Sequence, residues 1–164
     1  MKIFLRMMLA AMVLALSSMA ANAARTAPMF EPGRVEMQRV DGKAPTAAQV
    51  HEAILNGAKL DGGSWVWTVK SDVPGTVKLA YSRGNKFEAV IQIDYDKKGY
   101  QLKYVSSIGL RYSGAEGETR EIHRNYNKWI DTLLHKIAIP GELEPVAIPS
   151  SKDKDGTDDG KEDK

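Results

Sequence analysis

Residues 121–139 read EIHRNYNKWIDTLLHKIAI, and this stretch decides the fold. Its apolar side chains recur at steps of three and four, which is the spacing of one stripe on an α-helix. The stripe consists of Ile122, Tyr126, Trp129, Ile130, Leu133, Leu134 and Ile137. Polar and charged residues occupy the opposite face and suit water. Because an amphipathic helix must pack its stripe on a partner, we expect a sheet to lie beneath it.

Upstream of this helix, apolar and polar residues alternate in four segments, which predicts four strands. Turn residues separate the segments at 72–75, 83–85 and 96–99. Connections this short permit antiparallel hairpins and not parallel crossovers. The predicted meander has one apolar face and one wet face. Its expected core residues are Trp67, Val69, Leu79, Tyr81, Ile91, Ile93, Leu102 and Tyr104.

A first helix is predicted from Thr46, where Thr46 and Gln49 have the spacing of a capping box. Val50 and Ile54 lie on its apolar stripe, and Gly57 marks either the end of the helix or a close contact. The sequence therefore predicts an α+β domain at residues 46–140. Its order is helix, four-stranded antiparallel meander, helix, and both helices lie on one face of the sheet.

The flanks of this domain have a different composition. Residues 24–45 lack periodicity and are expected to form a loosely ordered leader, with a short edge strand at residues 35–40. The alternation around Gly109 indicates that the last strand continues past a kink there. Residues 141–164 are expected to be an extended, charged, disordered tail, because ten of the last fourteen residues are Lys, Asp or Glu.

The first 23 residues have the pattern of a secretory signal peptide. Lys2 and Arg6 precede a short apolar run, and the small residues of Ala21-Asn22-Ala23 then fit a cleavage site. The alternative is an uncleaved membrane anchor. Cleavage near Ala23 would leave a periplasmic or secreted protein without a membrane span. The chain has no cysteine, so it forms no disulfide.

Charge and motifs exclude several classes of function. Removal of Lys2 and Arg6 from the 23 basic residues leaves 21, which equals the 21 acidic residues, so nothing calls for a nucleic-acid partner. His123 and His135 would lie about 18 Å apart along one helix and cannot share a metal. No catalytic motif is present, and Asp94 and Asp96 suit a strand and a turn. We expect no enzyme activity, no cofactor and no metal.

The most distinctive polar residues lie near the start of the last helix. Arg120, Arg124 and Lys128 are four residues apart and could receive an anion there, with Arg111 nearby. A solvated face is the alternative, since surface charges are common. The candidate binding residues are Arg120, His123, Arg124, Asn125, Asn127 and Lys128.

Asn125-Tyr126-Asn127 stands out because asparagine is a poor residue inside a helix. We interpret the pair as a polar clasp that holds residues 106–118, since half-buried polar groups usually find local partners. A patch that faces a ligand is the alternative interpretation.

The segment from Ile122 to Ile130, with the helix at 46–50 and the strand at Gly99-Tyr100, resembles small exported proteobacterial proteins. Many of these are lipoproteins, and they carry an Asn-Tyr-Asn-x-Trp helix. The resemblance covers residues 46–139 and implies an exported protein of this fold, without implying an activity. This chain lacks the cysteine that carries a lipid anchor, so membrane anchoring does not carry over.

We therefore expect a non-enzymatic periplasmic binding or interaction module. Exposed sheet edges could pair with an extended protein partner or with a second copy. The alternative is a small-ligand-binding protein with a pocket between the sheet and the helices. The sequence gives least support to a hydrolase.

Overall fold

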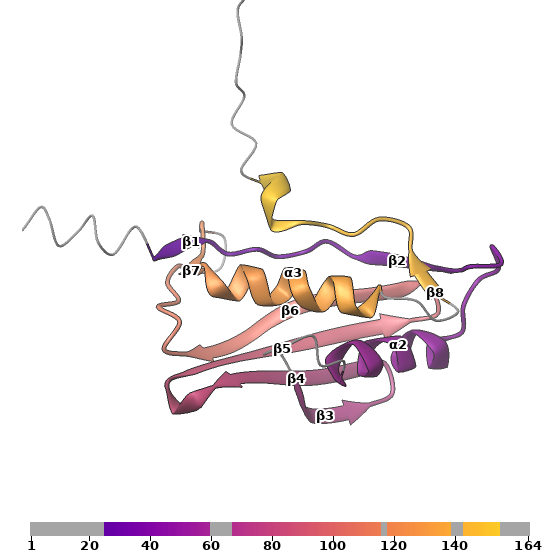
Figure 1. The fold of residues 1–164 in the computed structure, drawn as a ribbon, viewed down its shortest axis with the longest axis horizontal. Coiled ribbons are helices and arrows are strands. Elements are labelled where there is room, and N and C mark those ends of the chain that lie inside the picture. The colour runs from indigo at the N-terminus through magenta and orange to yellow at the C-terminus, as the bar shows by residue number, and fades with distance from the viewer. Residues whose placement is uncertain (1–24, 60–66, 116–117, 139–142, 155–164) are drawn as a thin grey trace, which may run out of the picture.

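The computed structural model describes residues 25–59, 67–115, 118–138 and 143–154 (Figure 1). The predicted signal peptide, the turn at 61–64 with Trp65, and the charged tail from residue 155 lie outside the described residues. The described part is an α+β structure with two helices, a six-stranded antiparallel sheet and a small two-stranded sheet.

The predicted meander forms the larger part of the main sheet. Its strands are β3 (Thr68–Val73), β4 (Thr76–Arg83), β5 (Phe87–Asp96) and β6 (Gly99–Ile108), each antiparallel to the next. A short 3-10 helix, η1 (Gly84–Lys86), joins β4 to β5. The prediction of four strands is incomplete, because two further strands extend the sheet beyond β6.

These two strands come from the flanks. β2 (Val35–Arg39) pairs with the start of β6, and β8 (Leu143–Pro145) pairs with β2. The predicted edge strand at 35–40 therefore exists, but it lies inside the sheet, and β3 and β8 are the outer strands. The expectation of a loosely ordered leader is wrong for residues 25–45, and residues 143–145 of the predicted tail are also part of the sheet.

A small sheet lies beside the amino end of the last helix. β1 (Thr26–Pro28) pairs antiparallel with β7 (Glu121–His123). The last helix, α3, covers Asn125–Ile137, so the expectation of a helix from Glu121 is wrong in its first residues. Ile122 is buried as predicted, but it is buried from a strand.

The first helix, α2, covers Ala47–Lys59 and begins with the predicted capping box. The Gln49 backbone N–H donates to Thr46 Oγ1 at 3.2 Å, and the Thr46 backbone N–H donates to Gln49 Oε1 at 3.0 Å. Gly57 is buried inside the helix rather than at its end. A Cβ at Gly57 would lie 2.8 Å from the Ile137 backbone nitrogen, so this glycine permits close contact between α2 and α3.

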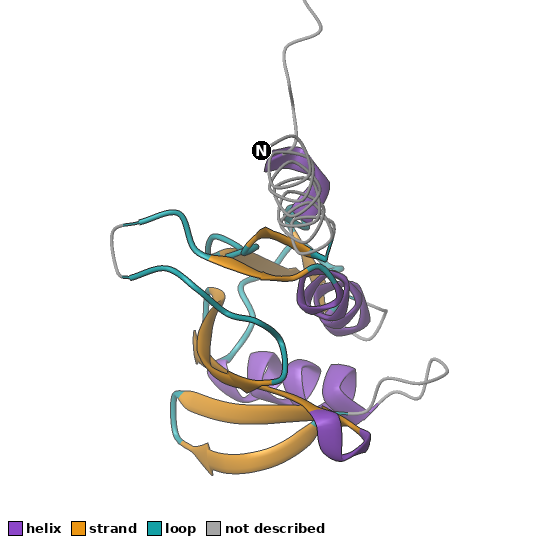
Figure 2. Ribbon diagram, turned by 90° about the vertical axis from the view of Figure 1, so that its left-hand side faces the viewer, coloured by secondary structure: helices purple, strands orange, loops and turns teal. Residues whose placement is uncertain are grey.

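Both helices lie along the same side of the sheet in Figure 1, and Figure 2 shows that the strands do not lie in a single plane. One core joins the helices to the sheet. It contains Trp67, Leu79, Tyr81, Ile91, Ile93 and Leu102 from the expected sheet residues, and every residue of the predicted helical stripe, of which Ile122 lies in β7 and the others in α3. The leader adds Met29, Phe30, Val35 and Met37.

Two of the expected core residues lie at its margin. Val69 is 39% exposed. It pairs with Leu79, but it sits on the outer strand beside a bulge between Val69 and Ser71. Tyr104 is partly buried and stacks on Tyr112 with the ring centroids 4.6 Å apart. The alternation therefore predicted the correct face of the sheet for Val69. It did not predict that Val69 lies on an outer strand, where it is more exposed.

Candidate functional site

The six predicted binding residues divide into a structural group and a charged group. Arg120 forms an ion pair with Glu31 of the leader. The Asn127 side chain accepts a hydrogen bond from the Phe30 backbone N–H at 3.0 Å and donates one to the Pro28 carbonyl at 2.9 Å. Arg120 and Asn127 thus hold the leader on the domain and are not grouped with the other four.

The predicted polar clasp was expected to join Asn125 and Asn127 to residues 106–118. The structure instead shows the Asn127 side chain bound to residues 28–30. The Met29 backbone N–H adds a hydrogen bond of 2.7 Å to the Arg120 carbonyl. Nothing near the asparagines indicated that a segment almost one hundred residues earlier would lie against them.

His123 is the centre of the charged group. Burial, followed by the positive charges of Arg111, Arg124 and Arg25, lowers the pKa of His123 below its usual value. Its Nδ1 accepts a hydrogen bond of 3.2 Å from the Asn125 backbone N–H. The neutral ring therefore carries its proton on Nε2. His123 adds a hydrogen-bond donor to a cationic region without adding a fourth charge.

Backbone contacts bring these residues together from distant parts of the chain. The His123 backbone N–H donates to the Leu110 carbonyl at 2.8 Å, and the Arg124 backbone N–H donates to the Arg25 carbonyl at 3.1 Å. The rings of His123 and Phe87 lie with their centroids 6.4 Å apart. The prediction that Arg111 lies near the start of the last helix is thus confirmed. Arg25 also lies in this group, although the sequence did not indicate it.

The chain between β6 and β7 turns sharply beside this group. Gly109 has φ +71°, and a Cβ there would lie 2.1 Å from the Lys86 carbonyl oxygen, so only glycine fits. Arg111 has φ +52°, which is uncommon for a residue with a side chain. The expected continuation of β6 past Gly109 is wrong, because the strand ends at Ile108.

The turn between β4 and β5 completes the same end of the molecule, on the left in Figure 1. Arg83 and Lys86 lie in this turn, and Arg83 pairs with Phe87 across the hairpin. We call this region the cationic end. It comprises Arg25, Arg111 and Arg124 around His123, and Arg83 and Lys86 in the neighbouring turn, together with Phe87 and Ile108.

All five cations of the cationic end are exposed. Its segments, residues 25–28, 83–88, 108–111 and 121–124, contain two carboxylates, Glu88 and Glu121. Each accepts a hydrogen bond of 3.1 Å from a neighbouring hydroxyl, from Ser82 and Thr26 respectively. Five cations and two carboxylates give this end a formal charge of +3. The balanced charge of the predicted mature chain, with 21 basic and 21 acidic residues after removal of Lys2 and Arg6, concealed this local excess.

The two remaining predicted residues lie on the first turns of α3. Asn125 begins the helix beside His123. Lys128 follows one turn later, is exposed, and donates its backbone N–H to the Arg124 carbonyl at 3.4 Å. His123, Arg124 and Asn125 are therefore close neighbours, and Lys128 continues the positive charge along the helix.

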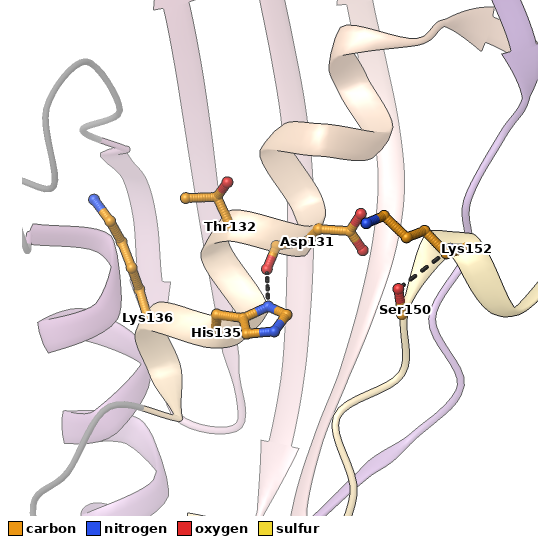
Figure 3. Close-up of a pocket in the computed structure, with 6 residues that line it drawn as sticks. All are labelled: Asp131, Thr132, His135, Lys136, Ser150 and Lys152. Carbon is orange, nitrogen blue, oxygen red and sulfur yellow. Dashed lines mark hydrogen bonds between the residues drawn. The ribbon is translucent and has the colours of Figure 1, made fainter.

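A hollow of about 520 Å³ lies at the opposite end of α3 (Figure 3). Asp131, Thr132, His135 and Lys136 line it from the helix, with Ser150 and Lys152 from the C-terminal segment. Figure 3 shows that these side chains do not converge on one point.

Inside this hollow, the polar groups already bind one another. The Ser151 backbone N–H donates to Asp131 Oδ1 at 3.0 Å, and the Ser151 hydroxyl donates to Oδ2. His135 Nδ1 lies 2.7 Å from the Asp131 carbonyl oxygen and donates to it. The arrangement fastens the C-terminal segment to α3, and we assign the hollow a structural role.

The two aspartates considered for acid–base chemistry also have local partners. Asp94 accepts hydrogen bonds from Gln92, Thr76 and Lys103 at 2.7, 3.0 and 2.7 Å. Burial opposes its charged form, but these hydrogen bonds, led by that of Lys103, lower the pKa of Asp94 below its usual value. Asp96 accepts from the Lys98 backbone N–H in the turn at 2.7 Å. Both carboxylates are held as surface anions.

Within the described ranges, no three His, Cys, Asp or Glu side chains are placed to hold a metal ion together. None of the helices in the described residues is long and apolar enough to cross a bilayer. Comparisons of the chain with known protein families, with curated proteins and with solved structures found no match. The geometry of the cationic end is therefore the basis for the function proposed for this protein.

Proposed function

We propose that the protein is a non-enzymatic, exported binding module that holds an anionic partner at its cationic end. The observation that carries this proposal is that four separate segments bring five exposed cations to the end of the molecule that holds His123. A local excess of positive charge on an exposed surface attracts anions. A partner that is rich in carboxylate or phosphate groups would fit this charge.

The chemistry of the individual groups supports an anionic partner. Arg side chains present several N–H donors in a planar fork that matches carboxylate and phosphate oxygens. His123 Nε2–H adds a donor among them. Burial and the three arginines lower the pKa of His123, so its ring remains neutral near pH 7. The ring can therefore donate a hydrogen bond to an anion without adding to the positive charge.

Pairing of an exposed sheet edge with a protein partner or a second copy, which the sequence also suggested, has weaker support. β3 is an outer strand, and both Val69 and Val73 are exposed on it. However, the bulge between Val69 and Ser71 includes Lys70, and bulges and lysines on edge strands oppose pairing with another chain. We therefore place the binding surface at the cationic end rather than at β3.

The proposal is tested by titrating a fluorescently labelled polyglutamate with the purified chain at low salt and following its anisotropy. We expect binding that weakens with added salt, since exposed charges are screened. Arg111→Gln combined with Arg124→Gln should weaken it at least tenfold. Lys97→Gln combined with Lys98→Gln removes the same charge from the turn at the other end of β5 and serves as the control.

Two results would overturn the proposal. One is the absence of saturable polyglutamate binding by the unmodified chain. The other is equal weakening by the two double variants, which would show that net charge alone is responsible. Melting curves of both variants establish that each is folded before binding is compared.

A further inference from the structure

The cationic end also carries exposed apolar side chains. Phe87 is 36% exposed and Ile108 is 62% exposed, although both lie at strand ends among arginines and a lysine. Phe87 lies beside His123, and a Cβ added at Gly109, the residue after Ile108, would lie 3.1 Å from the Phe87 ring. Apolar side chains surrounded by cations are typical of surfaces that rest on an anionic bilayer, where the cations meet headgroups and the apolar groups enter the interface.

The position of the apolar run in the sequence also favours a bilayer as the partner. Arg25 belongs to the cationic end, and in the sequence the apolar run of residues 7–19 precedes it by a few positions. A precursor held in a bilayer by that run would present this end of the domain to the headgroups. In such a precursor, the cationic end would be the part of the domain that is nearest to the membrane.

The opposite end of the sheet has a different character. Its turn at residues 96–99 places Asp96 next to Lys97 and Lys98, and Asp96 forms an ion pair of 2.5 Å with Arg34. Charges of both signs are mixed there, whereas cations dominate the cationic end. This asymmetry would orient the domain on a charged plane rather than merely attract it.

We infer that the cationic end is a docking surface for the anionic phospholipid surface of a bilayer, with Phe87 and Ile108 entering the interface. The inference rests on the proposed function and names the class of its partner. It requires no membrane-spanning segment, because the contact involves exposed side chains of strand ends and turns. Each Lys or Arg near such a surface strengthens binding roughly fivefold.

The test is co-sedimentation of the purified chain, residues 24–164, with vesicles. This chain contains every described residue and omits the apolar run, which would bind lipid by itself. Vesicles of phosphatidylcholine with one third phosphatidylglycerol should carry the protein down at low salt, and vesicles of phosphatidylcholine alone should not. Binding should fall as ionic strength rises.

Two matched double variants locate the surface. Arg25→Gln with Lys86→Gln changes two exposed cations of the cationic end and should weaken vesicle binding about thirtyfold. Lys97→Gln with Lys98→Gln changes two exposed cations of the opposite end and should weaken it less than threefold. Ile108→Ser keeps the charge unchanged and should also weaken binding, because it removes an apolar side chain from the interface.

The outcomes separate the inference from the proposed function. Binding to labelled polyglutamate without binding to anionic vesicles would overturn the bilayer as the partner and leave the anion-binding function standing. Failure to bind either probe would overturn both. Equal losses of vesicle binding in the two double variants would overturn the inference that the cationic end docks on the bilayer. An Ile108→Ser variant that binds as tightly as the unmodified chain would overturn it as well.

Discussion

His123 shows at the scale of one residue how the cationic end affects stability. An unfolded histidine titrates near about pH 6.5. Burial and then Arg111, Arg124 and Arg25 lower the pKa of His123 in the folded chain, so the unfolded chain binds more protons below that pH. The free energy of unfolding should therefore fall as pH drops from about 7 through the folded pKa, and should be fully retained above about 7.

We predict that His123→Gln makes the free energy of unfolding less dependent on pH between about 5 and 7, as measured by urea unfolding at several pH values. Glutamine keeps an acceptor for the Asn125 N–H but does not titrate. His135→Gln, a change at the exposed histidine near the other end of α3, is the control and should keep the slope. Equal slopes for all three proteins would show that His123 is not the residue responsible.

The Asn127 side chain binds two backbone groups of the leader from α3. Replacing it with alanine leaves the Phe30 N–H and the Pro28 carbonyl without their partner, and loss of such bonds costs about 1–3 kcal/mol. We predict that Asn127→Ala destabilises the protein by this amount and speeds hydrogen exchange at the Phe30 amide. Asn125→Ala, the same change two residues earlier, should leave that amide protected, and rapid exchange in both variants would contradict the assignment.

At the scale of elements, the contact between α2 and α3 depends on the absence of one side chain. Alanine favours a helix over glycine by about 1 kcal/mol, so Gly57→Ala should stabilise an isolated α2. In the folded chain, its Cβ would lie 2.9 Å from Ile137 Cα and 2.6 Å from Ile137 Cγ1, and the two helices would have to separate. We predict a net loss of stability on thermal melting. Asn56→Ala, on the exposed face of α2, supplies the control.

The elements that the sequence predicted are those with a local pattern. The capping box at Thr46, the stripe of α3 and the meander from β3 to β6 each depend on residues close together in the chain. β1 and β8 have three residues each, and their partners lie far away in the sequence. β2 has five residues and was predicted as a strand, but its place inside the sheet depends on partners that are equally distant. Three residues establish no periodicity, so the pairing of Thr26 with His123 leaves no local signal.

At the scale of the whole molecule, the sequence predicted only part of the candidate site, because contacts between distant parts of the chain leave no local pattern. The helix pattern placed Arg124 and Lys128 together and indicated Arg111 nearby. A meander places alternate turns at the same end of a sheet, so the turn with Arg83 and Lys86 could have been assigned to the end that holds Ile108. Arg25 could not, because its position depends on the pairing of β1 with β7.

The C-terminal segment, residues 143–152, closes the molecule on the side of β2. β8 pairs with β2, Leu143 is 6% exposed, and Ser151 binds Asp131 of α3. Burial of a leucine side chain contributes about 1.5–3 kcal/mol, and the Ser151 bonds add to it. We predict that a chain ending at residue 142 is about 2–4 kcal/mol less stable than one ending at residue 154.

The shorter chain should also change its state of association. Without β8, the outer edge of β2 presents N–H and C=O groups together with Met37, which is buried in the intact protein. An uncovered edge of this kind can pair with another chain. We expect the chain ending at residue 142 to form dimers or larger species in sedimentation, whereas the chain ending at residue 154, which lacks only the charged tail, should sediment as the intact protein does. Identical behaviour of the two truncated chains would show that β8 does not cover the edge of β2 in solution.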